Sequence, residues 1–179
     1  MNPGAIHIIF IEEPEAHLHP QMQEVFIRHL STMITNFQKD MPPDERWNIQ
    51  FIVSTHSSHI ANETEFKNIR YFTSSSNSSV VKDLNWYFTD ATTQEDIKFI
   101  HKYMSLTKCD LFFADKAILV EGITERILLP LFMRSSAPAL RNQYVSIVEV
   151  GGAYAHHFYK FLKFIGLQTL IITDIDSVK

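Results

Sequence analysis

The chain has 179 residues, of which 45% are hydrophobic and 20% are charged, and its formal net charge is −4 at pH 7. This composition excludes an intrinsically disordered segment and a collagen-like repeat, and a protein that coats DNA would be basic instead. The apolar runs are much shorter than the roughly 20 residues of a membrane-spanning helix, and one cysteine excludes an internal disulfide. We therefore expect a cytoplasmic chain without a membrane segment, and length alone suggests one domain.

The first third of the chain predicts two buried parallel strands separated by a helix. The apolar run Ile6–Ile11 ends at the turn Glu12–Pro14, which is typical of a buried strand in a parallel sheet. A helical pattern then runs from Pro20 to Phe37, with apolar residues every three or four positions. Gln50–Ser54 is predicted to be the second strand.

The middle of the chain is polar and predicts a hairpin followed by a helix. The strands Ile69–Thr73 and Val80–Asn85 flank a serine-rich tip, and Thr93–Tyr103 has the pattern of a helix. Cys109–Asp115 is expected to be a connector, and the Cys109 thiol to be a packing group.

The alternation of strands and helices then restarts. The predicted order is strand, helix, strand, helix, strand, over Ala117–Val120, Thr124–Met133, Tyr144–Val150, Ala155–Ile165 and Thr169–Thr173. A βαβαβ series implies a parallel sheet with right-handed crossovers. We therefore expect parts of two α/β domains, residues 1–115 and residues 116–179, in place of the single domain that length suggests.

Two adjacent carboxylates, Glu12 and Glu13, follow the first strand at the edge where open α/β sheets bind ligands. One acid at this place can hold Mg²⁺, and the next can deprotonate an attacking water, as in the Walker B motif of nucleotide hydrolases. The second strand ends at the same edge and delivers His56, a candidate sensor of the γ-phosphate.

The sequence EEPEAHLHP over residues 12–20, with STHS over residues 54–57, resembles the ABC-type ATPases, in particular their DNA-repair and RecF-like branch. This resemblance makes Glu12 the acid on the Mg²⁺ side, Glu13 the catalytic acid and His56 the switch histidine. A zinc site is the alternative for the local histidines, namely His17, His19, His56 and His59.

The phosphate-binding motif G-x-x-x-x-G-K-[ST] is missing from the sequence, and so is a signature of the L-S-G-G type. In the proteins that this chain resembles, both motifs precede Walker B. We therefore expect a fragment that does not bind and hydrolyse ATP by itself.

Carboxylates also follow two strands of the second series. Glu121 ends one strand, Gly122 allows the sharp turn, and Glu125 lies in the first helical turn, where the helix dipole favours an acid. Asp174 and Asp176 follow the last strand, and their spacing points both the same way. Two divalent cations would relieve the repulsion among four such carboxylates and create a phosphodiester-cleaving site.

These residues, with the glycine pair 151–152 after the second strand, resemble the Toprim fold. An ATPase part joined directly to a Toprim part is the arrangement of the OLD (overcoming lysogenization defect) family, which includes the nuclease subunit of the Gabija anti-phage system. The implied fold is α/β: the C-terminal part of an ABC-type ATPase domain, then the N-terminal part of a βαβαβ Toprim domain.

The resemblance also implies an activity. Glu121, Asp174 and Asp176 would be primary ligands of Mg²⁺ or Mn²⁺, and Glu125 would belong to the second metal site. The intact protein would be an ATP- and metal-dependent DNA endonuclease in anti-phage defence. It would form a homodimer through its ATPase region and work with a helicase-like partner. Toprim domains continue past the D-x-D motif, so we expect little nuclease activity from this chain alone.

Two other functions stay open at this point. The chain could be a non-nucleolytic regulatory subunit whose ATPase part pairs with a protein that carries the Walker A lysine. It could also be a Toprim element of a primase or topoisomerase, which would require a catalytic tyrosine or a zinc ribbon elsewhere.

Overall fold

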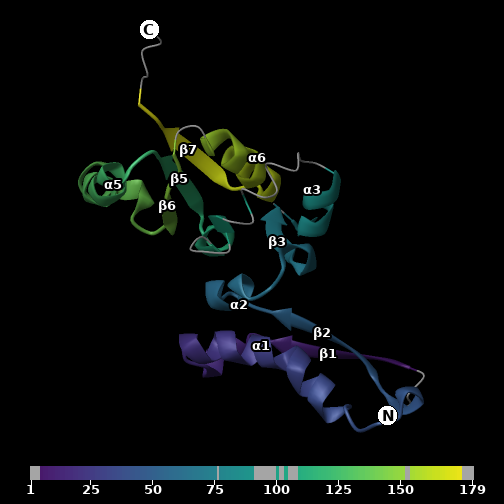
Figure 1. Cartoon of the computed structure of the whole chain (residues 1–179). Helices are drawn as coiled ribbons and strands as arrows, with labels where there is room; N and C mark the ends of the chain where they lie inside the picture. Colours follow the sequence, from purple (N-terminus) through teal and green to yellow (C-terminus); the bar gives the residue numbers. More distant parts are fainter. Residues whose placement is uncertain are drawn as a thin grey trace. The chain divides into compact units, whose positions relative to one another are not determined.

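The computed structural model describes residues 5–75, 77–90, 100, 103–104, 109–151 and 154–174. The chain divides into two compact units, Met1–Thr64 and Glu65–Lys179 (Figure 1). The predicted helix Thr93–Tyr103 lies largely outside the described residues. Over the part of the chain that is described, no helix combines the length and the apolar character needed to cross a membrane.

The first unit is built on two parallel strands, β1 (Ile6–Glu12) and β2 (Asn48–Ser54). They pair in register from Ile6 opposite Asn48 to Glu12 opposite Ser54, so their carboxyl ends meet at one edge. The long helix α1 (Pro20–Phe37) connects them and lies along the strand pair (Figure 1). A single 3₁₀ turn, η1 (Pro14–His17), precedes α1; η2 (Pro43–Glu45) precedes β2, and the short helix α2 (Ser58–Asn62) follows it.

Two buried glutamines attach α1 to the rest of the first unit. The Gln23 amide donates to the Leu18 carbonyl at 2.9 Å, and its oxygen accepts from the Ser57 hydroxyl at 2.5 Å. The Gln38 oxygen accepts the Trp47 N–H at 2.8 Å, and the Gln38 amide donates to the Trp47 carbonyl at 3.2 Å. Because both side chains are satisfied, their burial carries no unpaired-group cost.

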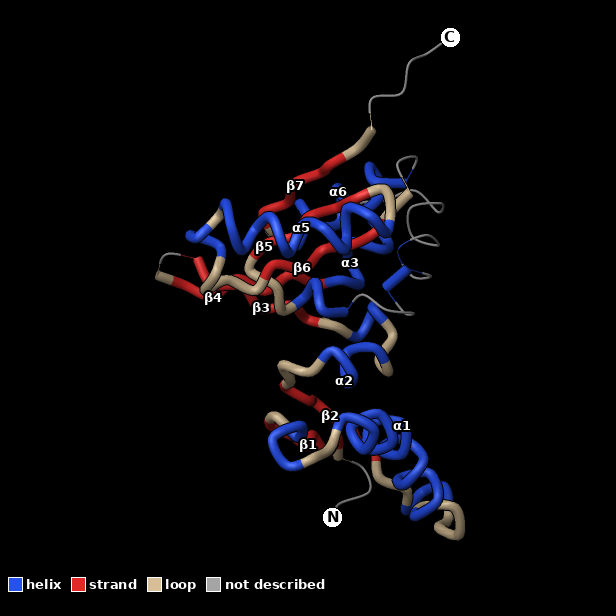
Figure 2. The backbone as a smooth tube through the Cα atoms, turned by 90° about the vertical axis from the view of Figure 1, so that its left-hand side faces the viewer, coloured by secondary structure: helices blue, strands red, loops and turns tan. Residues whose placement is uncertain are grey.

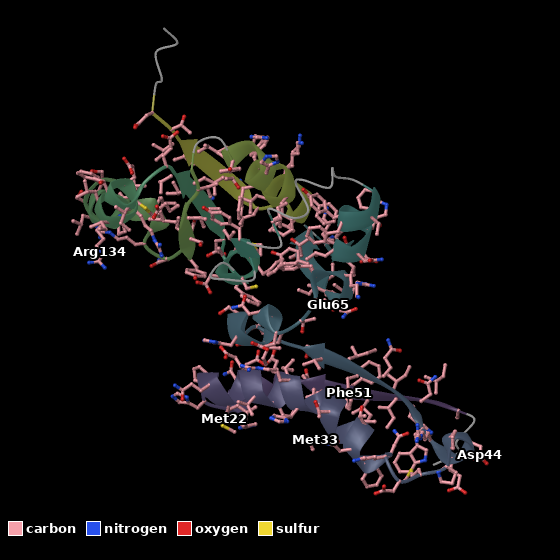
Figure 3. All side chains as sticks on the ribbon, in the orientation of Figure 1. Met22, Met33, Asp44, Phe51, Glu65 and Arg134 are labelled. Atoms are coloured by element: carbon pink, nitrogen blue, oxygen red, sulfur yellow. The ribbon has the colours of Figure 1, made fainter. Side chains whose placement is uncertain are left out.

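The two strands are not buried on both sides, contrary to the prediction. Their residues alternate between half-buried and exposed, and the exposed positions of β1 include Ile6, Ile8 and Phe10. Phe10 is 74% exposed. The helix has an exposed apolar side as well: Met22 and Met33 project from α1 away from the strands (Figure 3). An uninterrupted apolar run is what a strand with two covered faces requires, but in this unit only one face is covered.

The second unit begins with a hairpin formed by β3 (Arg70–Ser75) and β4 (Ser78–Asp83), as the sequence predicts. The antiparallel ladder extends into the serine-rich segment, through Ser74 opposite Ser79 and Ser75 opposite Ser78. The turn η3 (Phe66–Asn68) precedes the hairpin, and the helix α3 (Leu84–Asp90) follows it. A further turn, η4 (Cys109–Phe112), leads to the main sheet.

The main sheet of the second unit has three parallel strands in the order β6-β5-β7. They are β5 (Lys116–Val120), β6 (Val145–Glu149) and β7 (Gln168–Ile172). The helices α5 (Ile123–Ser136) and α6 (Ala155–Ile165) connect them and lie on opposite faces of the sheet (Figures 1 and 2), and η5 (Pro138–Leu140) leads into β6. The predicted βαβαβ series is confirmed, with β5 in the centre.

The core of the second unit lies on the α6 side of this sheet. α6 buries five residues, and its Phe161 is part of an aromatic cluster with Tyr87, Phe88 and Phe112. By contrast, the described residues of α5 include no buried side chain, and its apolar residues Ile127 and Leu131 are 61% and 58% exposed. The core of the second unit therefore lies on one side of the sheet only.

Cys109 is 1% exposed, which agrees with a packing thiol. Burial raises the pKa of this thiol to about 12, and the nearby Asp110 charge adds to the effect. A thiol with so high a pKa is almost entirely protonated at neutral pH and is a poor nucleophile.

Candidate functional site

The first candidate site lies where β1 and β2 end together. Glu12 is the last residue of β1 and pairs with Ser54, the last residue of β2. The Glu13 N–H continues the ladder by one bond, since it donates to the Ser54 carbonyl at 3.0 Å. The predicted pair of acids thus stands at the carboxyl edge of a parallel sheet, where such sheets bind ligands.

Glu13 has an unusual backbone. Its φ of 41° and ψ of 57° are left-handed, and no other non-glycine residue in the described ranges has a positive φ. This conformation costs an L-residue roughly 1–2 kcal/mol, and such outliers gather at functional sites. The turn directs the chain from the strand into η1 and leaves the Glu13 side chain half exposed.

The structure brings Glu13 and His56 together. Glu13 Oε1 lies 3.2 Å from His56 Nε2, and the two side chains are 50% and 79% exposed. Glu13, the predicted base, and His56, the predicted phosphate sensor, are therefore adjacent and accessible to solvent. Two side chains that act on the same phosphate group have to be close together in this way. Because both side chains are exposed to solvent, the attraction between them contributes little to the stability of the fold. The contact matters because it places the two side chains side by side.

Glu15 also reaches His56, a role that sequence reasoning missed. Its Oε1 accepts the His56 backbone N–H at 2.5 Å, across 41 positions of sequence. The only signal for it was a third acid in the EEPE sequence. A strand pattern cannot show that η1 folds back onto the turn after β2.

The other histidines of this region do not gather into a zinc site. His59 Nδ1 lies 3.0 Å from Glu24 Oε1 and so links α2 to α1, while His17 and His19 are exposed around the start of α1. Across the described ranges, no three His, Cys, Asp or Glu side chains are grouped so that they could hold a metal ion. The described residues therefore do not support a zinc site formed by these histidines.

The second candidate site is the carboxyl edge of the β6-β5-β7 sheet. Glu121 follows β5 directly, and Glu125 lies in the first turn of α5. The Glu125 carboxylate folds back over the turn: a Cβ added to Gly122 would come within 3.0 Å of Glu125 Oε2. Gly122 has an extended backbone, so what it contributes is space for that carboxylate.

Asp174 lies at the same edge. Val120 of β5 pairs with Ile172 of β7, so Thr173 is level with Glu121 and Asp174 stands one residue further out, exposed to solvent. Asp176 lies outside the described residues. The sheet thus brings Glu121 and Asp174 to neighbouring strand ends. Carboxylate oxygens are the ligands that Mg²⁺ and Mn²⁺ prefer, but the described residues contain no group of three such side chains here either.

Comparison with known proteins matches two segments of the chain to known families. The family described as "Overcoming lysogenization defect protein-like, TOPRIM domain" matches residues 112–176, and the family described as "AAA ATPase domain" matches residues 2–61. Residues 112–176 therefore form an OLD-like Toprim segment. The predicted order, an ATPase part followed by a Toprim part, is thereby confirmed.

Relatives of the chain are named as nucleases. "Endonuclease GajA" of Bacillus cereus strain HuB5-5 is 33% identical over 183 residues, which cover 96% of this chain and 26% of that protein. "Endonuclease GajA" of Bacillus cereus strain VD045 is 28% identical, with coverage of 96% and 26%. "Old nuclease" of Escherichia phage P2 is 24% identical, with coverage of 94% and 28%. The chain spans about a quarter of the length of these relatives.

The boundary between the two parts stays a prediction. The family matches leave residues 62–111 uncovered, and the compact units divide after Thr64. The predicted division falls after Asp115. The two divisions therefore differ in the part to which they assign residues 65–115.

Proposed function

We propose that this chain is part of an ATP-dependent, divalent-metal-dependent DNA endonuclease that acts in anti-phage defence. One observation carries the proposal: acids stand at the carboxyl edges of two parallel sheets. They do so in a chain that is related over 96% of its length to a protein named as an endonuclease. ATP would be hydrolysed at the edge of the first sheet, and DNA would be cut at the edge of the second.

At the first edge, Glu12 would stand on the Mg²⁺ side of the bound nucleotide and Glu13 would take a proton from the attacking water. His56 would donate a hydrogen bond from Nε2 to the γ-phosphate. Because Glu13 lies 3.2 Å from that nitrogen, the histidine ring would exchange its contact with the carboxylate for one with the phosphate. The sequence contains no P-loop motif, so that loop would come from residues outside these 179 or from a partner.

At the second edge, Glu121, Asp174 and Asp176 would hold Mg²⁺ or Mn²⁺, and Glu125 would serve a second ion. When bound, the metal supplies an activated water and neutralises charge on the scissile phosphate. Gly122 keeps room for the Glu125 carboxylate beside Glu121. The chain itself is acidic, with a net charge of −4, so most contacts with the DNA backbone would lie elsewhere in the protein. We further propose a homodimer through the ATPase region and a helicase-like partner.

The test is cleavage of supercoiled plasmid by the intact protein while Mg²⁺ or Mn²⁺ is titrated. Glu121→Ala and Asp174→Ala should each reduce the rate by at least a hundredfold, because each removes a ligand whose charge the metal needs. Asp110→Ala is the matched control, since this exposed acid lies in η4, which leads into the opposite end of the sheet; its rate should stay unchanged.

Undiminished cleavage by both site variants would remove the assignment of the metal ligands. A wild-type protein that hydrolyses ATP but never cuts DNA, at any metal concentration, would favour the regulatory-subunit alternative.

A further inference from the structure

The turn that carries His56 is supported by side chains from both of its flanks. The Ser57 N–H donates to Thr55 Oγ1 at 2.9 Å, within the turn. Ser57 Oγ donates to the buried Gln23, which holds the α2 side of the turn on α1. On the other side, the Glu15 carboxylate accepts the His56 N–H at 2.5 Å. His56 therefore has its main chain and its ring held by separate groups.

Both acids that hold His56 come from one short segment. Glu13 contacts the ring and Glu15, two residues later in η1, contacts the backbone of the same residue. The left-handed turn at Glu13 starts the 3₁₀ segment that brings Glu15 to this position. The Glu15 oxygen is thus in direct hydrogen-bond contact with the main chain of His56.

The second oxygen of Glu15 is buried, and no hydrogen-bond partner for it exists among the described residues. Burying a carboxylate oxygen without a donor costs free energy. A residue placed only for stability would not need a polar side chain here, since an apolar side chain would fill the space without that cost. Among the described residues, the one hydrogen bond of the Glu15 side chain is the bond to His56.

We infer that Glu15 is a positioning residue for the ATP hydrolysis proposed above: it fixes the His56 backbone, the point from which the ring reaches either the Glu13 carboxylate or the γ-phosphate. This inference rests on the proposed function of the first site. Glu15 need not touch ATP in this role, and its importance lies in accepting one N–H rather than in its charge.

The test compares Glu15→Ala with Glu15→Gln in the intact protein. The glutamine keeps an oxygen that can accept the His56 N–H, while the alanine removes the acceptor. We expect Glu15→Ala to lower kcat for ATP hydrolysis at least tenfold with the KM for ATP changed less than twofold, and Glu15→Gln to retain at least a third of kcat. Glu45→Ala removes an exposed acid of η2 and is the control for a change in charge.

A second measurement reports the contact itself. In the 179-residue chain, amide hydrogen exchange at His56 should accelerate at least tenfold in Glu15→Ala and stay near the wild-type rate in Glu15→Gln. The Ala61 amide, which bonds to the Ser57 carbonyl at 3.1 Å, is the internal reference. If the substitution merely loosened the unit, Ala61 would accelerate with His56.

The outcomes separate this inference from the function on which it rests. Glu13→Gln should abolish hydrolysis. If it does and Glu15→Ala leaves kcat unchanged, the positioning role is wrong; if Glu15→Gln is as slow as Glu15→Ala, the charge matters and the inference fails too. If Glu13→Gln hydrolyses ATP normally, the proposed ATPase site fails and the functional role of Glu15 is overturned with it. Unchanged exchange at His56 in Glu15→Ala would refute the contact in either case.

Discussion

Glu13 shows how the requirements of a site can conflict with the preferences of a residue. Its left-handed backbone precedes Pro14, and a following proline disfavours the helical region for the residue before it. Glycine would accept this conformation without steric cost, yet the chain has a glutamate whose carboxylate lies 3.2 Å from His56. No propensity pattern predicts this, because propensity favours residues that suit their backbone. The signal in the sequence was only the pair of acids before a proline.

The strain at Glu13 can be measured by comparing Glu13→Gly with Glu13→Ala, since both variants lack the carboxylate and differ only in Cβ. We expect the glycine variant to be more stable by about 1 kcal/mol, because only glycine is free of the left-handed penalty. Urea unfolding of the 179-residue chain, followed by circular dichroism, gives the two values. Gln21, exposed in the first turn of α1, is the control position: there the glycine variant should be no more stable than the alanine variant. Equal stability of the two Glu13 variants would mean that the backbone is relaxed.

At the scale of elements, sequence periodicity predicted most of the structure but only part of its packing. The span of α1 is confirmed from Pro20 to Phe37, and that of α6 from Ala155 to Ile165. The buried side of α1, however, is defined partly by Gln23 and by Gln38, the residue directly after the helix, and an apolar pattern ignores both. Hydrogen bonds to Leu18, Ser57 and Trp47 make these glutamines core residues. Such pairings join distant positions and cannot be read from spacing.

The contribution of Gln23 can be tested by replacing it with alanine. The Leu18 carbonyl and the Ser57 hydroxyl would each lose a partner, so we expect the free energy of unfolding to fall by about 1–3 kcal/mol. Gln21→Ala is the matched control, because it changes the same residue type two positions earlier on the exposed side and should alter stability by less than about 0.5 kcal/mol. Urea midpoints of both variants decide the matter. A Gln23 variant that unfolds together with the Gln21 control would show that α2 and the His56 turn do not depend on this link.

At the scale of the whole molecule, the motifs predicted the two kinds of domain, while the boundary between them stays a prediction. EEPEAHLHP and the acids after β5 and β7 contain the candidate catalytic residues, and such residues lie at strand ends. The segment 65–115 has no such motif, so its place depends on packing. In the structure this segment belongs to the second unit. Its Tyr87 lies 4.6 Å, between ring centroids, from Phe164 of α6, and its Phe112 lies 6.0 Å from Phe161.

These aromatic contacts lead to a prediction about where the chain can be cut. A truncated chain of residues 65–179 retains the rings that cover α6, so we expect it to unfold cooperatively on heating. A chain of residues 116–179 loses Tyr87, Phe88 and Phe112, and exposes Phe161, which is fully buried in the structure. Each aromatic pair is worth about 0.5–1.5 kcal/mol beyond the area it buries, and a chain of 64 residues has little stability to lose. The shorter chain should therefore lack a cooperative transition in circular dichroism at 222 nm. If it melts at the same temperature as the longer chain, then residues 65–115 are dispensable to the Toprim part and the division after Asp115 describes the folding unit better than the division after Thr64.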